Sequence, residues 1–97
     1  MTFVLQIEHA VRDYDAWKEA FDRDPVDRRG GGVRRYRILR PVDDPAYVAV
    51  DLVFDDAGAA RAFMGSLRRL WESPTAQAAM AGAPRARIVE PVEVVDL

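Results

Sequence analysis

The chain has 97 residues and no cysteine, so we expect one small domain over residues 1–97, without a disulfide framework, a thiolate metal site or a cysteine nucleophile. Its net charge of −2 argues against nucleic-acid binding, because proteins that follow phosphates are usually basic. No apolar run approaches the roughly 18 residues that cross a bilayer, and the N-terminus lacks the pattern of a secretion signal, so we expect no membrane partner and a cytoplasmic location.

The first predicted elements are a strand and an amphipathic helix. Apolar and polar residues alternate over 3–9, which predicts a strand whose odd-numbered side chains, His9 included, face the helices. The helix is predicted over 13–21, with Asp13 as its N-cap. It should end near Asp24, because Pro25 disfavours helical geometry in the residue before it. Its inner face carries aromatic residues at helical spacing: Tyr14, Trp17 and Phe21.

Residues 25–32 connect this helix to the second strand and include three consecutive glycines, 30–32. A phosphate-binding loop needs glycines that lead from a strand into a helix, whereas these lead from a helix into a strand. We therefore expect a flexible connection. The second and third strands are predicted over 33–39 and 47–54, joined by the turn-rich segment 41–46.

The second half of the chain repeats the helix and strand pattern. A helix is predicted over 59–71, capped by Asp55 or Asp56. Ser73 and Pro74 then fit an N-cap and a first helical residue, which predicts a short third helix through Met80. The last strand is predicted over 86–95, and Pro91 within it indicates an edge strand or a bulge.

The order strand-helix-strand, given twice, predicts a ferredoxin-like α+β fold. In this fold four antiparallel strands lie in the order 4-1-3-2, with both helices on one face. The other face mixes apolar and polar side chains, and a small domain usually covers such a surface. The second strand is basic, whereas the fourth strand with its tail is acidic. We therefore expect a homodimer through the sheet face, in which opposite charges approach each other.

The pattern resembles the dimeric α+β barrel superfamily of ferredoxin-like domains over nearly the whole chain. The stretches that carry the resemblance are EHAVRDYDAWKEAFD at 8–22 and FMGSLRRLWESPTAQAAMAGAP at 63–84. This superfamily includes cofactor-free antibiotic-biosynthesis monooxygenases, haem-degrading enzymes, muconolactone isomerases, chlorite dismutase-like proteins and stress-responsive barrels. The resemblance implies a dimeric α/β barrel with a pocket inside each subunit, between sheet and helices. It implies no single activity.

His9 is the only histidine, and so the only side chain whose ordinary pKa suits proton transfer near neutral pH. We expect it at the rim of the pocket, as a general base or as a hydrogen-bond donor to a phenolate-like substrate. The alternative is that His9 is a polar residue near solvent and that the aromatic residues belong to the core. The candidates to line a pocket for a planar hydrophobic ligand are Tyr14, Trp17, Tyr36 and Trp71.

No cofactor and no metal are expected. A single histidine with scattered carboxylates is not a cluster of ligands. Haem-degrading relatives use a histidine of the second helix as iron ligand, and residues 57–71 contain none. Two functions stay open: a cofactor-independent monooxygenase or isomerase for a small aromatic or polyketide-like compound, and a non-catalytic protein that binds a small hydrophobic ligand or has a stress or accessory role. A third possibility is a regulatory ligand sensor within a larger assembly, but no feature of the sequence favours it.

Overall fold

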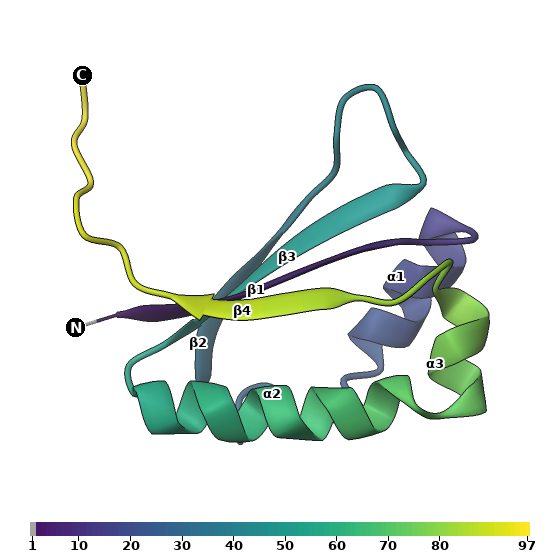
Figure 1. Ribbon diagram of the computed structural model, residues 1–97, viewed down its shortest axis with the longest axis horizontal. Coiled ribbons are helices and arrows are strands. Elements are labelled where there is room, and N and C mark those ends of the chain that lie inside the picture. Colours follow the sequence, from purple (N-terminus) through teal and green to yellow (C-terminus); the bar gives the residue numbers. More distant parts are fainter. Residues whose placement is uncertain (1) are drawn as a thin grey trace.

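The computed structural model describes residues 2–97. Its strands form one antiparallel sheet in the order β2-β3-β1-β4, and the helices lie to one side of it (Figure 1). This arrangement confirms the predicted ferredoxin-like α+β fold and the predicted strand order. The elements are β1 (Phe3–Ala10), α1 (Tyr14–Asp22), β2 (Val33–Leu39), β3 (Tyr47–Phe54), α2 (Ala57–Trp71), α3 (Pro74–Ala79) and β4 (Arg85–Val89).

Each helix begins at a side chain that caps it. Asp13 accepts a hydrogen bond from the Ala16 amide at 3.1 Å at the start of α1. Asp56 and Ser73 do the same for α2 and α3. These bonds satisfy amides that have no partner inside the helix, which is why the predicted caps agree with the structure, although α2 begins two residues before the predicted range. No helix among residues 2–97 has the length and apolar character needed to cross a membrane.

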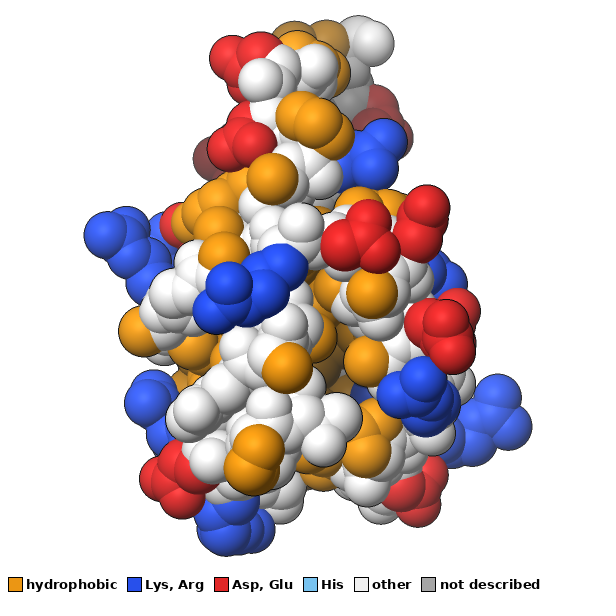
Figure 2. Space-filling model, turned by 90° about the vertical axis from the view of Figure 1, so that its right-hand side faces the viewer, with side chains coloured by type: hydrophobic (Ala, Val, Ile, Leu, Met, Phe, Trp, Pro, Cys, Tyr) orange, Lys and Arg blue, Asp and Glu red, His pale blue; other side chains and the backbone are white. Residues whose placement is uncertain are grey.

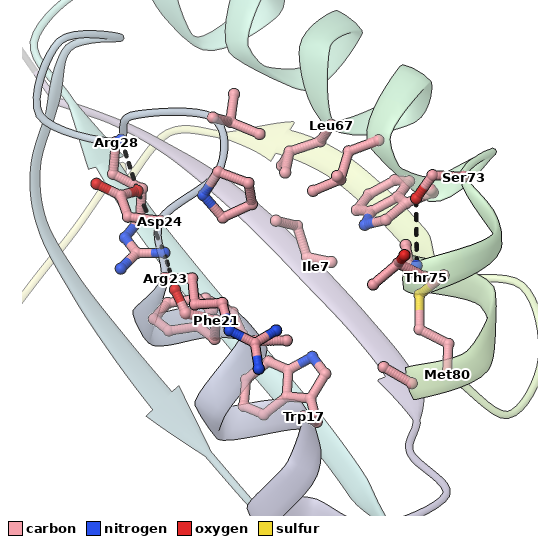
Figure 3. Close-up of a pocket in the computed structure, with 18 of the residues that line it drawn as sticks. Ile7, Trp17, Phe21, Arg23, Asp24, Arg28, Leu67, Ser73, Thr75 and Met80 are labelled. Carbon is pink, nitrogen blue, oxygen red and sulfur yellow. Dashed lines mark hydrogen bonds and ion pairs between the residues drawn. The ribbon is translucent and has the colours of Figure 1, made fainter.

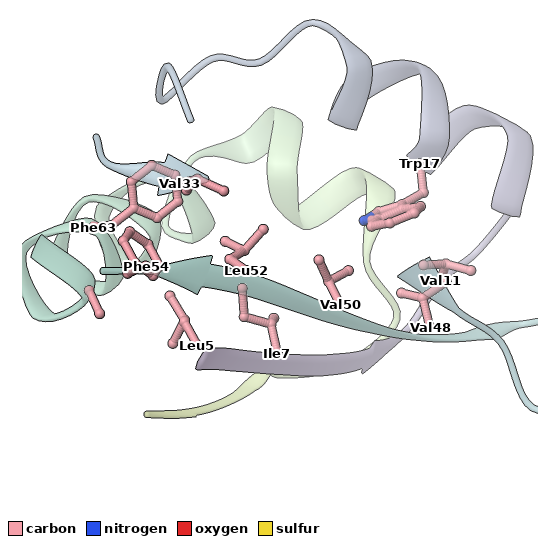
Figure 4. Close-up of a cluster of buried hydrophobic side chains, with 11 residues drawn as sticks. Leu5, Ile7, Val11, Trp17, Val33, Val48, Val50, Leu52, Phe54 and Phe63 are labelled. Atoms are coloured by element: carbon pink, nitrogen blue, oxygen red, sulfur yellow. The ribbon is translucent and has the colours of Figure 1, made fainter. Parts of the chain in front are cut away.

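The hydrophobic core lies between the sheet and the helices (Figure 4). Alternate residues of β1 and β3 point toward the helices, since Leu5 pairs with Leu52 and Ile7 pairs with Val50 across the ladder. Phe54 is fully buried and packs against Phe63 of α2, with ring centroids 5.7 Å apart. The remaining buried members of the cluster are Val11, Trp17, Val33, Val48 and Ala60.

The glycine-rich loop between α1 and β2 packs against α2. The Gly31 amide donates to the Asp27 carbonyl at 2.9 Å, and the Val33 amide donates to the Arg28 carbonyl at 3.0 Å. A Cβ atom at Gly31 would lie 2.5 Å from Cδ1 of Phe63, so only glycine allows this close approach. The glycines therefore have a packing role in addition to connecting two elements.

The last strand is shorter than predicted. β4 ends at Val89, and residues 90–97 extend away from the sheet (Figure 1). The prediction that the strand continues to residue 95 is wrong because Pro91 has no amide hydrogen for the ladder, and β4 is an edge strand with no neighbour on its outer side. The acidic residues that were assigned to the fourth strand therefore lie in the tail, where Val92 and Val94 are exposed.

Candidate ligand-binding site

A cavity of about 300 Å³ lies between the sheet and the helices, at the small end of the range for small-molecule sites. Ile7, Val50 and Leu52 form its floor on the sheet. α1 and the loop after it form one wall, and α2 with α3 forms the other (Figure 3). Figure 2, which views the molecule from the right-hand side of Figure 1, shows hydrophobic atoms in a central hollow and charged side chains mainly around the margin.

The two walls differ in the side chains that they present. The α1 wall contributes aromatic rings and, from the loop that follows, charged groups: Trp17, Phe21, Arg23, Asp24 and Arg28. The opposite wall is largely aliphatic, with one indole and two hydroxyl groups: Leu67, Leu70, Trp71, Ser73, Thr75 and Met80. The cavity is therefore apolar over most of its surface, and its charged groups all come from the wall formed by α1 and the loop after it.

His9 lines the cavity and is only 5% exposed. Its Nδ1 lies 2.9 Å from the Ala10 carbonyl oxygen, so Nδ1 carries the proton and Nε2 has a free lone pair. Nε2 has no hydrogen-bond partner among the described residues. Every fully buried side-chain nitrogen or oxygen of residues 2–97 does have a partner, so Nε2 is not fully buried. Nε2 is therefore accessible, and the accessible space beside His9 is the cavity.

Burial lowers the pKa of His9 below its ordinary value, because an imidazolium is poorly solvated there, and the hydrogen bond to the Ala10 carbonyl acts in the opposite direction. His9 is thus a neutral imidazole near pH 7. A neutral ring with Nε2 facing an apolar cavity has the form that a general base needs.

The Ala10 carbonyl also holds α3 in place. It accepts a hydrogen bond from the Ala81 amide at 3.0 Å, in addition to the one from His9. An isolated antiparallel β-bridge between Val11 and Met80 also joins the segment after β1 to the end of α3. The end of α3 and the end of β1 are therefore fastened to each other beside the candidate base.

Trp17 is the aromatic neighbour of His9. The two rings are edge to face, with centroids 5.9 Å apart. The centroids of the Trp17 and Phe21 rings are 5.2 Å apart. Trp17 is buried and lines the cavity. Its indole N–H has no hydrogen-bond partner among the described residues, so this donor, like Nε2 of His9, is not fully buried and is accessible from the cavity. An acceptor on His9 and a donor on Trp17 thus lie on neighbouring rings.

The four aromatic candidates divide into two pairs. Trp17 and Trp71 line the cavity from opposite walls, whereas Tyr14 and Tyr36 are not among the lining residues. Tyr14 packs behind Trp17, with centroids 5.8 Å apart. Tyr36 points to the helix side, since it pairs with Leu52, but it lies on an edge strand and is 44% exposed. Its ring packs against Phe21 at 5.1 Å, so it supports the wall from outside.

Sequence reasoning did not find Arg28, whose side chain is only 16% exposed at one end of the cavity. It lies in an irregular loop, where neither helical nor strand spacing indicates which way a side chain points. Met80 was placed only at the end of a helix, and the structure adds it to the cavity wall. Residues 2–97 contain no group of three or more histidine, cysteine or acidic side chains arranged to hold a metal ion.

No protein-family model matches the sequence, and no curated protein matches it either. Solved structures do match. SnoaB, a cofactor-independent oxygenase from Streptomyces nogalater, has a TM-score of 0.77 and 14% sequence identity, over 97% of this chain and 96% of that chain. The chain shares its fold. The resemblance to the antibiotic-biosynthesis monooxygenase group is therefore confirmed at the level of the fold.

Two further structures extend this likeness. A monooxygenase of Streptomyces coelicolor, in complex with the ligand nanaomycin D, has a TM-score of 0.66 and 14% identity, over 98% of this chain and 91% of that chain. A dimeric ferredoxin-like protein from an uncultured marine organism also has a TM-score of 0.66, with 11% identity over 97% of this chain and 98% of that chain. Identities this low establish the common architecture and leave activity to the residues of the site.

Proposed function

We propose that the protein is a cofactor-independent monooxygenase that oxidises a small, flat hydroxyaromatic compound in the cavity beside His9. The observation that carries the proposal is the accessible Nε2 of a buried, neutral histidine in an otherwise apolar cavity. Two proteins that share the fold are oxygenases, which supports the same reaction class. The substrate itself supplies the electrons, so the site needs a base, a dry cavity and access for O₂.

The reaction begins when His9 Nε2 removes a proton from an acidic CH₂ group, which leaves a carbanion delocalised over the hydroxyaromatic ring. The carbanion forms a C–O bond with O₂, and the peroxide takes up the proton from His9. Removal of the second CH₂ proton then breaks the O–O bond, forms C=O and releases hydroxide, which leaves with that proton as water. One CH₂ group and one O₂ thus become one C=O group and one water.

The surroundings of His9 favour the first of these steps. A flat ligand that fills the apolar cavity displaces water from it, so a hydrogen bond to the developing oxyanion is stronger there than in solution. The indole N–H of Trp17 is an accessible donor, on a ring whose centroid lies 5.9 Å from that of His9. The hydrogen bond from Nδ1 to the Ala10 carbonyl fixes the tautomer that leaves Nε2 free.

Oxygen uptake with a hydroxyanthrone tests this function, with quinone formation followed by absorbance. His9→Ala should reduce kcat by about 10²-fold, the usual contribution of a positioned base. Tyr14→Phe is the matched control, because Tyr14 packs behind Trp17 without lining the cavity, and it should keep kcat within about twofold. Equal rates for His9→Ala and the wild type would exclude His9 as the base.

A non-catalytic binding protein is the second candidate, and one observation favours it. Nδ1 of His9 bonds to a backbone carbonyl, so no carboxylate stabilises the imidazolium that a base must form. Such a protein would bind the hydroxyanthrone without O₂ uptake, and His9→Ala would change its affinity only a few-fold. Binding and oxygen uptake measured on the same samples separate the two candidates.

We also propose a homodimer formed through the helix-free face of the sheet. This face carries four arginines, which are Arg35 and Arg37 on β2 and Arg85 and Arg87 on β4. The tail carries Glu90, Glu93 and Asp96 among exposed valines, so the tail of one copy complements the basic face of another. Light scattering should give twice the chain mass of 10.9 kDa, and a stable monomer at micromolar concentration would exclude the dimer.

A further inference from the structure

Arg28 is held in one orientation at the end of the cavity. Its Nη1 donates to the Phe21 carbonyl at 2.8 Å, and its Cζ lies 3.9 Å from the centroid of the Phe21 ring. The Tyr36 ring approaches the same guanidinium at 5.1 Å. The Asp24 carboxylate accepts a hydrogen bond from the Arg28 amide at 2.9 Å and lies 3.5 Å from Nη1. These contacts fix the guanidinium before any ligand arrives.

Two nitrogen atoms of this guanidinium donate no hydrogen bond within the described residues. Nε and Nη2 of Arg28 have no hydrogen-bond partner among the described residues. Every fully buried side-chain nitrogen of residues 2–97 does have a partner, so these two nitrogen atoms are accessible. Nε and one terminal nitrogen form an edge whose two N–H groups match the two oxygens of a carboxylate. A fixed guanidinium with a free edge is a preformed anion site.

The position of Arg28 relative to His9 defines the shape of the ligand. The rings of Trp17 and Phe21 lie between the two residues, as a continuous row along α1. Arg28 and Asp24 lie at one end of the cavity, and Ser73 and Thr75 lie across it (Figure 3). A flat ligand anchored at Arg28 would extend along the Phe21 and Trp17 rings toward the base.

We propose that the pocket recognises an aromatic carboxylic acid, with the carboxylate on Arg28 and the reacting ring beside His9. This deepens the proposed function by adding the charge that the substrate must carry. It rests on the proposed cavity as a binding site, but it does not depend on turnover. Because the cation, the aromatic row and the base follow one another along the cavity, the ligand enters in a single orientation.

Quenching of tryptophan fluorescence measures binding directly, because the chain has only two tryptophans and both line the cavity. The probes are naphthalene-2-carboxylate and naphthalene-2-carboxamide, which differ in charge and hardly in shape. The wild type should bind the carboxylate at least about tenfold more tightly, as expected for charge-assisted hydrogen bonds. Arg28→Gln should abolish this preference while the carboxamide affinity stays within about twofold.

Arg29→Gln is the matched control, because it removes the same charge from the neighbouring, exposed residue outside the cavity. It should leave the preference for the carboxylate intact. Arg28→Gln with an unchanged preference would overturn the proposal, as would the absence of binding by both probes.

Asp24→Asn provides a test in the opposite direction. Asparagine keeps an oxygen for the Arg28 amide and tolerates the left-handed backbone at this position, where φ is 53°. It removes the negative charge that competes with a ligand carboxylate, so the carboxylate affinity should increase several-fold and the carboxamide affinity should not. Oxygen uptake without a carboxylate preference would overturn the anion site alone, whereas a preference without oxygen uptake would overturn only the proposed oxygenase.

Discussion

The helix-facing and helix-free sides of the sheet are built from the same strands, yet they differ in burial and in charge. On β3, Phe54 is fully buried under α2, while its neighbour Val53 points to the uncovered side. The covered side contains the core, the cavity and His9. The uncovered side holds an ion pair between Arg37 and Asp51 and a hydrogen bond from Tyr47 to Glu8. Alternation along each strand therefore places the core and the candidate site on one side and leaves the other side uncovered.

The largest difference between the two sides should appear when adjacent residues of β3 are truncated. Phe54→Ala should lower the free energy of unfolding by about 3–5 kcal/mol, since it removes a fully buried ring. Val53→Ala should lower it by about 1 kcal/mol or less. Denaturant unfolding at a concentration low enough to keep the chain monomeric makes the comparison. Equal losses would show that the helix-free side is as well covered as the core.

The ion pair on the uncovered side should have a smaller effect. Arg37 Nε lies 2.8 Å from Asp51 Oδ2, and the Asp51 side chain is only 12% exposed. Arg37→Met should therefore cost about 1 kcal/mol, because it leaves a shielded carboxylate without its partner. Arg34→Met is the control, since the pair of Arg34 with Asp55 is exposed at both ends and should contribute a few tenths of a kcal/mol. A larger loss for Arg34→Met would contradict this account.

The pH dependence of stability probes the covered side through His9. Burial lowers the pKa of His9 in the folded chain, so the unfolded chain binds a proton more readily as pH falls below about 6.5. Stability should therefore decrease in this range, down to the lowered pKa, and His9→Gln should remove that part of the decrease. Unfolding free energies of both proteins at about pH 8 and pH 5 provide the measurement. Parallel curves for the two proteins would contradict a buried neutral histidine.

The smallest effect on folding should come from the tail. Deletion of residues 91–97 removes exposed valines and acidic groups that contact no core residue. The unfolding free energy of the monomer should change by less than about 0.5 kcal/mol. The dimer should nevertheless dissociate at lower salt and higher protein concentration than the intact dimer. An unchanged dimer would place the interface away from the tail.

Periodicity predicted the fold because it reports which side of a strand or helix is buried. The positions of His9 on the covered side and of Trp17 on the inner face of α1 follow from spacing alone. Spacing did not predict the end of β4, because strand propensity continues through Val92 and Val94 while the ladder ends before Pro91. The strand propensity of a residue does not depend on whether a neighbouring strand is present, and β4 has a neighbour on one side only.

The candidate site was predicted less completely than the fold. Tyr36 points to the helix side, but only the position of β2 at the edge shows that its ring lies outside the cavity. Arg28 owes its orientation to a loop in which Asp24 and Asp27 adopt left-handed backbone angles. Such a conformation depends on contacts between distant residues, including Gly31 with Phe63, and these contacts have no period in the sequence.

The Ala10 carbonyl links the end of α3 to the His9 ring, because it accepts a hydrogen bond from each. A ligand as wide as two fused rings would displace α3 more easily than the sheet, because α3 is short and none of its residues is buried. If α3 swings outward, the bond from the Ala81 amide lengthens and the carbonyl is left to His9 alone. The remaining hydrogen bond from His9 would then be stronger than while the carbonyl also binds the Ala81 amide. One oxygen atom thus links the position of α3 to the hydrogen bond that fixes the tautomer of the proposed base.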